Sequence, residues 1–201
     1  MSRRVVVALL GPVTWSPPGI DPARWRTALA EDVVDLLATL NEVETAVAVT
    51  ARDRWLADAV VWPGTGVYEV SAPTPNAVFA AVAAGYDQVA VVAADAPDVP
   101  GLTLGKLLRP LTTRPVAVAP VEGGGAGLLG VAARLPVPAW LPELDLGTAE
   151  PAEVRRSAPS PGDVAVTAGW HRMRGPADLA ALDPAVEGWE ATRALLSGRP
   201  V

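Results

Sequence analysis

Two aspartates stand where a chain can build a small-ligand site. Asp95 directly follows an apolar run, residues 88–94, and Asp98 comes shortly after it. A carboxylate at the end of a buried strand should face a crevice, because burying its charge in the core is costly. The spacing lets both side chains approach one cation, and Mg²⁺ prefers such oxygen ligands. Two alternatives stay open: Asp95 bonds to the amides of its own turn, and Asp98 begins the next helix.

Residues near the C-terminus add aromatic and basic groups. Trp170 and Trp15 fall in expected loops and could stack on a base or a sugar, although most tryptophans serve packing. His171, the single histidine, could bind phosphate or move a proton, or do neither. Arg172 and Arg174 alternate along an extended segment, so both can face one space and offer paired donors to phosphate. The alternative is that both arginines are solvated.

Apolar runs that alternate with capped segments of helical periodicity predict the elements that position these residues. The expected strands are residues 4–10, 43–50, 67–70, 88–94, 116–119 and 164–167. The expected helices are residues 22–40, 51–60, 76–84 and 102–111, and two short ones from Pro176 and Pro184. Asp21, Thr74 and the pair Thr50 and Asp53 are the expected caps. The pattern predicts a single α/β domain, residues 1–201, with a mostly parallel (mixed) sheet and helices on both faces in three layers.

Ligands gather beyond the C-terminal ends of parallel strands. That rule selects four loops as the place for chemistry: residues 11–21, 95–100, 120–125 and 168–175. Residues 136–161 carry many prolines, and neither helical nor strand periodicity runs far there.

Composition excludes several classes of protein. The 201 residues contain no cysteine and one histidine, which excludes disulfide frameworks, thiolate metal sites and clustered-histidine zinc sites. The 22 acidic residues outnumber the 16 basic ones, which argues against a general nucleic-acid binder. The apolar run at residues 4–10 is too short for a membrane span and lacks a cleavage site after it, so we expect a cytoplasmic protein with no membrane partner.

Three consecutive features carry a resemblance to a known fold. They are the Ala-Asp-Ala-Pro-Asp run that ends at Asp98, the Pro-Val-Ala-Val-Ala-Pro run at residues 115–120, and the glycine-rich residues 123–131. Together they resemble the nucleotide-diphospho-sugar transferase fold, also called GT-A. Over residues 4–182 the chain is similar to small bacterial glycosyltransferase-like proteins and to 2-phospho-lactate guanylyltransferases, with further likeness at residues 26–29, 74–77 and 176–179.

The resemblance implies a transferase that moves a glycosyl or nucleotidyl group and binds a nucleotide or nucleotide-sugar. Asp95 would be the catalytic residue, and Mg²⁺ would be held by Asp95, Asp98 and Glu122. The residues implied in nucleotide or phosphate binding are Arg24, Arg26, Asn76, Gly124, Gly125, Arg172 and Arg174.

Departures from the family pattern motivate an alternative function. Gly123 stands where the family's acidic turn has Asp, and Arg172 and Arg174 stand where it has an Asp-x-Asp. Two cations there would repel Mg²⁺. The alternative is therefore a catalytically inactive member that binds a ligand or a protein. A third hypothesis takes the G-x-G-x-x-G at residues 125–130 as a dinucleotide site, which needs a helix at residues 128–133, where the resemblance implies a strand.

Overall fold

The apolar runs form a seven-stranded sheet in the computed structural model, which describes residues 2–198. The strands are β1 (Arg4–Leu9), β2 (Glu44–Thr50), β3 (Gly66–Val70), β4 (Gln88–Ala93), β5 (Val116–Pro120), β6 (Leu128–Arg134) and β7 (Val164–Val166). Their order is β3-β2-β1-β4-β6-β5-β7. Only β6 runs antiparallel to its neighbours, β4 and β5. The predicted mixed, mostly parallel sheet is confirmed.

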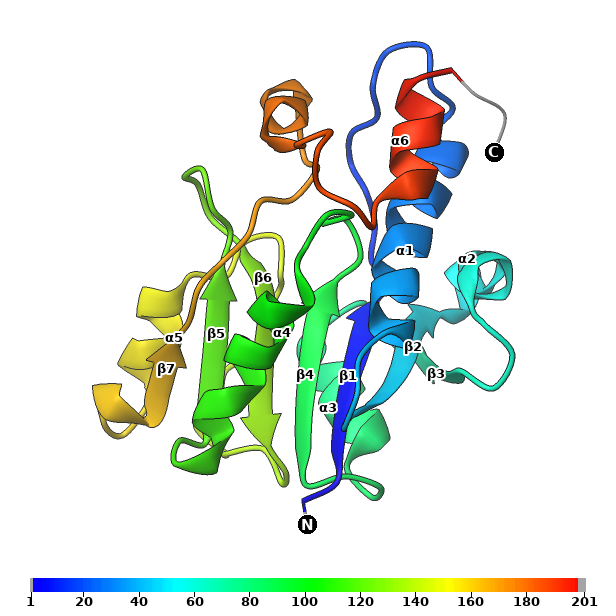
Figure 1. Ribbon diagram of the computed structural model, residues 1–201. Helices are drawn as coiled ribbons and strands as arrows, with labels where there is room; N and C mark the ends of the chain where they lie inside the picture. Colours follow the sequence, from blue (N-terminus) through cyan, green and yellow to red (C-terminus); the bar gives the residue numbers. More distant parts are fainter. Residues whose placement is uncertain (1, 199–201) are drawn as a thin grey trace.

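Helices cover both faces of this sheet (Figure 1). They are α1 (Pro22–Ala38), α2 (Arg54–Val60), α3 (Pro75–Val82), α4 (Gly101–Leu108), α5 (Pro151–Ser157) and α6 (Glu190–Leu196), with 3₁₀ turns at Ala51–Asp53, Arg109–Thr112, Pro161–Asp163 and Pro176–Ala181. α1, α2 and α4 pack on one face, and α3 and α5 pack on the other. Side chains of β1 enter the two cores alternately, which explains why the strand is apolar throughout. Within residues 2–198, no helix is both long and apolar enough to cross a membrane.

Helix starts follow the predicted capping chemistry at two of three places. The Asp21 carboxylate accepts a hydrogen bond from the Arg24 amide at the start of α1, over 3.0 Å. The Thr74 hydroxyl accepts one from the Ala77 amide at the start of α3, over 3.3 Å. Thr50 makes no such side-chain cap, and the expected helix at residues 51–60 is a 3₁₀ turn followed by α2.

Three stretches differ from the sequence predictions. Residues 128–133 belong to strand β6, so the helix required by the dinucleotide hypothesis is absent there and that hypothesis is wrong. The proline-rich stretch contains α5, which starts at Pro151 inside a capping box of Glu150 and Glu153. Near the C-terminus, Pro176 starts a 3₁₀ turn, and the last helix begins only at Glu190.

The C-terminal helix α6 is fixed to α1 by a buried carboxylate. Asp32 accepts hydrogen bonds from the amides of Ala191 and Thr192, over 2.9 and 2.8 Å. Those amides are in the first turn of α6, where backbone donors lack partners within the helix. Burial of the side chain raises the pKa of Asp32 to about 6, although the bonds from Thr192 and Ala191 act in the opposite direction.

We expect Asp32 to make stability fall as pH rises from about 4 to about 6. In this window the unfolded carboxyl has lost its proton while the folded one retains it, so the folded state binds more protons. The raised pKa of Asp32 corresponds to a decrease of roughly 1–3 kcal/mol in the free energy of unfolding across this pH window. Urea unfolding of the wild type and Asp32→Asn at both ends of the window measures it. The variant should lack this decline, and equal pH dependence of the two proteins would contradict the assignment.

Candidate functional site

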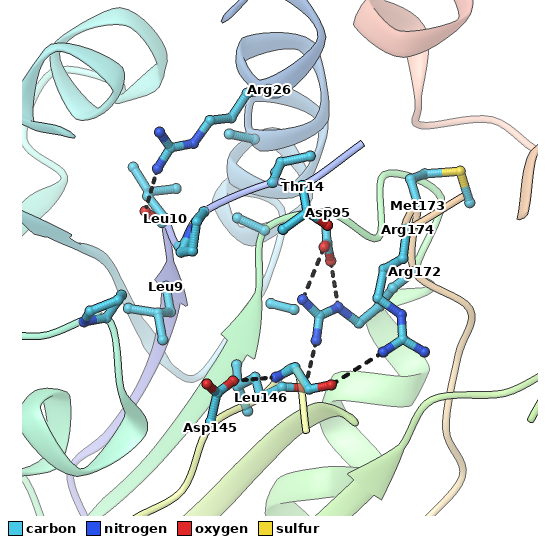
Figure 2. Close-up of a pocket in the computed structure, with 18 of the residues that line it drawn as sticks. Leu9, Leu10, Thr14, Arg26, Asp95, Asp145, Leu146, Arg172, Met173 and Arg174 are labelled. Carbon is cyan, nitrogen blue, oxygen red and sulfur yellow. Dashed lines mark hydrogen bonds and ion pairs between the residues drawn. The ribbon is translucent and has the colours of Figure 1, made fainter. Parts of the chain in front are cut away.

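A cavity of about 390 Å³ opens at the C-terminal ends of β1 and β4 (Figure 2). Residues 9–14 of the β1 end and its loop form one wall, and residues 93–95 form the base. Residues 145–148 and 172–174 close the opposite side. Ligand pockets of proteins commonly occupy about 300–1,000 Å³. This pocket therefore lies where the sheet topology predicts, and residues of three of the four loops selected from the sequence line it.

Asp95 faces this pocket, and its carboxylate is held by Arg172. The guanidinium donates through Nε to Oδ1 over 2.6 Å and through Nη2 to Oδ2 over 2.9 Å. Nη1 of Arg172 donates to the carbonyls of Leu128 and Leu146, over 3.0 and 2.7 Å. Asp95 and Arg172 are only 5% and 8% exposed. The pair is thus buried, bidentate and charge-balanced, and the partner of Asp95 is a distant arginine rather than its own turn.

Asp98 has separate partners. The Trp170 indole donates to Oδ1 over 3.0 Å, and His171 Nε2 lies 2.7 and 2.8 Å from the two oxygens. Asp98 is buried and does not begin α4, whose N-cap is Pro100. The two aspartates of one loop are therefore each engaged by the segment 170–174, which we call the closing segment.

The expected Mg²⁺ ligands do not come together as a metal site. Glu122 is exposed, and its amide donates to the Trp170 carbonyl over 3.0 Å. Across the described part of the chain, no three His, Asp or Glu side chains are grouped to hold a metal ion. The oxygens of Asp95 and Asp98 already bind donors of the closing segment. The residues present therefore do not fit the Mg²⁺ that the resemblance implies.

Arg172 and Arg174 both line the pocket, and so does Met173 between them, which also packs in a separate hydrophobic cluster with Trp25. Arg174 Nη1 donates to the Ala126 carbonyl over 2.7 Å and to the Gly147 carbonyl over 3.5 Å. Its Nε and Nη2 make no hydrogen bond within residues 2–198. Arg174 therefore retains N–H donors for a ligand, whereas most N–H donors of Arg172 bind oxygen atoms of the protein.

The other two candidate arginines lie in different environments. Arg26 lines the pocket but pairs with Asp53 over 3.1 and 2.9 Å and donates to the Leu10 carbonyl over 3.1 Å. The bonds from Arg26 hold the pKa of Asp53 below its ordinary value. Arg24 is exposed and lines a separate hollow beside Trp55. Only Arg26 is thus brought to the pocket, and it has an internal partner.

Asn76, Gly124 and Gly125 lie outside the pocket lining. Asn76 donates to the Pro142 carbonyl over 3.0 Å and accepts from the Leu144 amide over 2.8 Å. These two bonds give it a structural role, since they fix the loop after residue 141. Gly124 and Gly125 are exposed and have φ of +88° and +94°, a backbone region that favours glycine in the turn before β6.

The two loop tryptophans pack rather than face the pocket. Trp15 meets Trp25 edge-on with ring centroids 6.0 Å apart, in the cluster that contains Met173. Trp170 lies with its ring centroid 5.0 Å from that of His171 and packs against the core under α1 and α4. Neither tryptophan lines the cavity at the strand ends.

Sequence reasoning missed the loop at residues 145–148. The Leu146 carbonyl is one of the acceptors of Arg172, and Asp145 accepts from the Gly147 amide over 2.6 Å in a tight turn. The Asp-x-Gly spacing is a turn signal that marked this position. This turn signal is hard to recognise, because the surrounding prolines predict an irregular structure for the whole stretch.

Comparison with known proteins gives structural likeness alone. No family profile matches the sequence, and no curated protein matches it. A crystal structure from Desulfovibrio desulfuricans G20, provisionally assigned as a nucleotide-diphospho-sugar transferase, matches over 100% of both chains with a TM-score of 0.65 and 16% identity.

Two further structures carry bound groups. CMP:2-keto-3-deoxy-manno-octonic acid synthetase complexed with CTP matches with a TM-score of 0.58 and 17% identity over 98% of each chain. Rv0371C of Mycobacterium tuberculosis H37Rv, in complex with manganese, matches with a TM-score of 0.56 and 16% identity, over 92% of this chain and 100% of that one. Together with the sheet order, these likenesses show that the chain has the nucleotide-diphospho-sugar transferase fold.

Proposed function

We propose that the protein binds a nucleotide or a nucleotide-sugar in the pocket at the ends of β1 and β4, as a transferase-like protein. The observation that carries the proposal is the Arg174 guanidinium, which lines this pocket with donors that the described chain does not use. An arginine in this position suits phosphate oxygens, because its planar donors bind them in pairs. The CTP bound to a protein of the same fold supports a nucleotide as the ligand class.

The rest of the pocket suits the uncharged part of such a ligand. Leu9, Leu56, Pro73 and Met173 contribute apolar surface, and Thr14 contributes a hydroxyl-bearing side chain. Pockets for small molecules combine such apolar walls with a few polar groups that fix orientation. A phosphate at Arg174 would leave a base or a sugar against these walls.

A second candidate is a catalytically inactive member of the fold that binds its ligand without transferring a group. The bidentate hold of Arg172 on Asp95 favours it, because that carboxylate cannot also act as a metal ligand or a base. Incubation with CTP or a sugar nucleotide, followed by product analysis, separates the two candidates. Turnover by the wild type would support the transferase, and binding without turnover would support the inactive member.

Nucleotides should stabilise the wild type. A ligand at about 100 times its Kd adds about 2.7 kcal/mol, which a thermal-shift screen resolves easily. Arg174→Ala should weaken binding by about tenfold, or about 1.4 kcal/mol, because it removes a charged phosphate donor. Raised salt should weaken binding to the wild type as well.

Arg24→Ala is the matched control, since Arg24 is an exposed arginine of α1 outside the pocket. This variant should bind as the wild type does. The proposal fails if no nucleotide or sugar nucleotide shifts the melting temperature, or if the two arginine variants lose affinity equally.

A further inference from the structure

The guanidinium of Arg172 sits inside a set of four oxygen atoms. Oδ1 and Oδ2 of Asp95 accept from Nε and Nη2, and the carbonyls of Leu128 and Leu146 accept from Nη1. All four distances lie between 2.6 and 3.0 Å. The oxygens come from the end of β4, the start of β6 and the loop at residues 145–148. Carboxylate and carbonyl oxygens are the ligands that hard divalent cations take. The fold thus gathers a cation-type donor set, and a side chain of the chain itself fills it.

Charge balance leaves no room for a second cation at this position. Arg172 neutralises Asp95, and both are nearly inaccessible to water. A divalent ion brought against this buried guanidinium would be repelled, because charges interact strongly where water is excluded. The presence of Arg172 also changes the net charge of the whole pocket lining. The charged residues that line it are three arginines against two aspartates, Asp95 and Asp145, so the excess of positive charge depends on Arg172.

We infer that Arg172 is a built-in replacement for a divalent cation, so that the pocket receives a phosphate-bearing ligand without metal. The inference rests on the proposed function for the identity of the ligand. Arg172 cancels the charge of Asp95, which would otherwise repel a phosphate, and Arg174 on the same wall makes the direct contact. Metal independence is then a property of this chain, although a protein of the same fold is known in complex with manganese.

The test that needs no nucleotide is a Mn²⁺ titration of four proteins. These are the wild type, Arg172→Ala, Arg172→Lys and the double variant Arg172→Ala/Asp95→Ala. Removal of the guanidinium leaves Asp95 and the two carbonyls to a metal ion, whereas lysine retains a positive charge in the same place. Bound Mn²⁺ is followed by loss of the electron paramagnetic resonance signal of the aqueous ion, and folding is followed by thermal melting.

We expect Mn²⁺ to bind Arg172→Ala alone. At about five times its Kd the ion should raise the melting temperature of that variant by roughly 3 °C. The wild type, the lysine variant and the double variant should neither bind the ion nor shift. Binding of Mn²⁺ to the wild type overturns the inference, and so does a folded Arg172→Ala that binds none.

A second measurement decides the matter if Arg172→Ala does not fold at any Mn²⁺ concentration. The affinity of the wild type for CTP is then compared in EDTA and in Mg²⁺. Equal affinity supports the inference, and a requirement for Mg²⁺ overturns it. If CTP binds in neither buffer, the proposed function loses its support, and the wild-type Mn²⁺ titration alone decides the inference: no bound Mn²⁺ supports it, and bound Mn²⁺ overturns it.

Discussion

Arg172→Met is expected to lower the free energy of unfolding by about 3–5 kcal/mol. The substitution keeps the bulk of the side chain but leaves the Asp95 carboxylate buried without its counter-charge. It also removes the hydrogen bonds that Arg172 donates to the carbonyls of Leu128 and Leu146, of which the Leu146 carbonyl keeps its bond from the Leu128 amide. Urea unfolding at pH 7 measures the loss.

Two comparisons show whether the loss comes from an orphaned charge. The double variant Arg172→Met/Asp95→Leu should recover more than half of it, because neither ion then remains buried. Arg54→Ala breaks the exposed pair of Arg54 and Asp58, whose side chains are 48% and 64% accessible, and should cost less than about 1 kcal/mol. A double variant as unstable as Arg172→Met would show that lost packing, not charge, is responsible.

Gly169→Ala should destabilise the fold by about 2–3 kcal/mol, since it overpacks a tight backbone approach. A Cβ at residue 169 would lie 2.0 Å from the Pro120 carbonyl oxygen. The chain cannot easily yield there, because the Trp170 amide donates to that same oxygen and the Glu122 amide donates to the Trp170 carbonyl. The methyl group would therefore displace the start of the closing segment and weaken the contacts of Trp170 and His171 with Asp98. Chemical unfolding gives the loss, and tryptophan fluorescence follows the displacement.

Gly105→Ala is the matched control for that substitution. Gly105 is exposed inside α4, and a Cβ there would meet nothing within 4 Å. Alanine at such a helical position should stabilise the protein by about 0.5–1 kcal/mol. The close approach at residue 169 would be refuted if Gly169→Ala were as stable as the wild type.

Local signals in the sequence predicted most of the framework. Buried strands are continuous apolar runs, and two helix starts are marked by Asp21 and Thr74 beside a proline, so both features are readable from neighbouring residues. The helix α5 is not predicted, although Pro151 stands at its first turn, because the many prolines around it indicate an irregular stretch. The direction of β6 depends on which strands flank it, and the residues of the strand do not encode that.

The candidate site is less predictable than the fold, because the side chains that pair within it lie far apart along the chain. The apolar run before Asp95 predicts that both aspartates follow a strand, as they do, but their spacing suggests a shared cation. Their actual partners are 72 to 77 positions away in the closing segment. The resemblance implies that Arg26 binds phosphate, but its guanidinium pairs with Asp53, which belongs to another element. Pairings of this kind arise from the topology of the sheet and leave no mark in local spacing.

That separation along the chain has a consequence for synthesis. A chain leaving the ribosome presents Asp95 and Asp98 well before Trp170, His171 and Arg172 have been made. Through that interval β1 to β4 can pair, but the two carboxylates have to remain hydrated, since an ion without its partner is costly to bury. The closing segment, which crosses from the β7 edge toward the middle of the sheet (Figure 1), is thus the last part of the pocket to be delivered. Each new molecule becomes able to receive a ligand only after its closing segment has been synthesised.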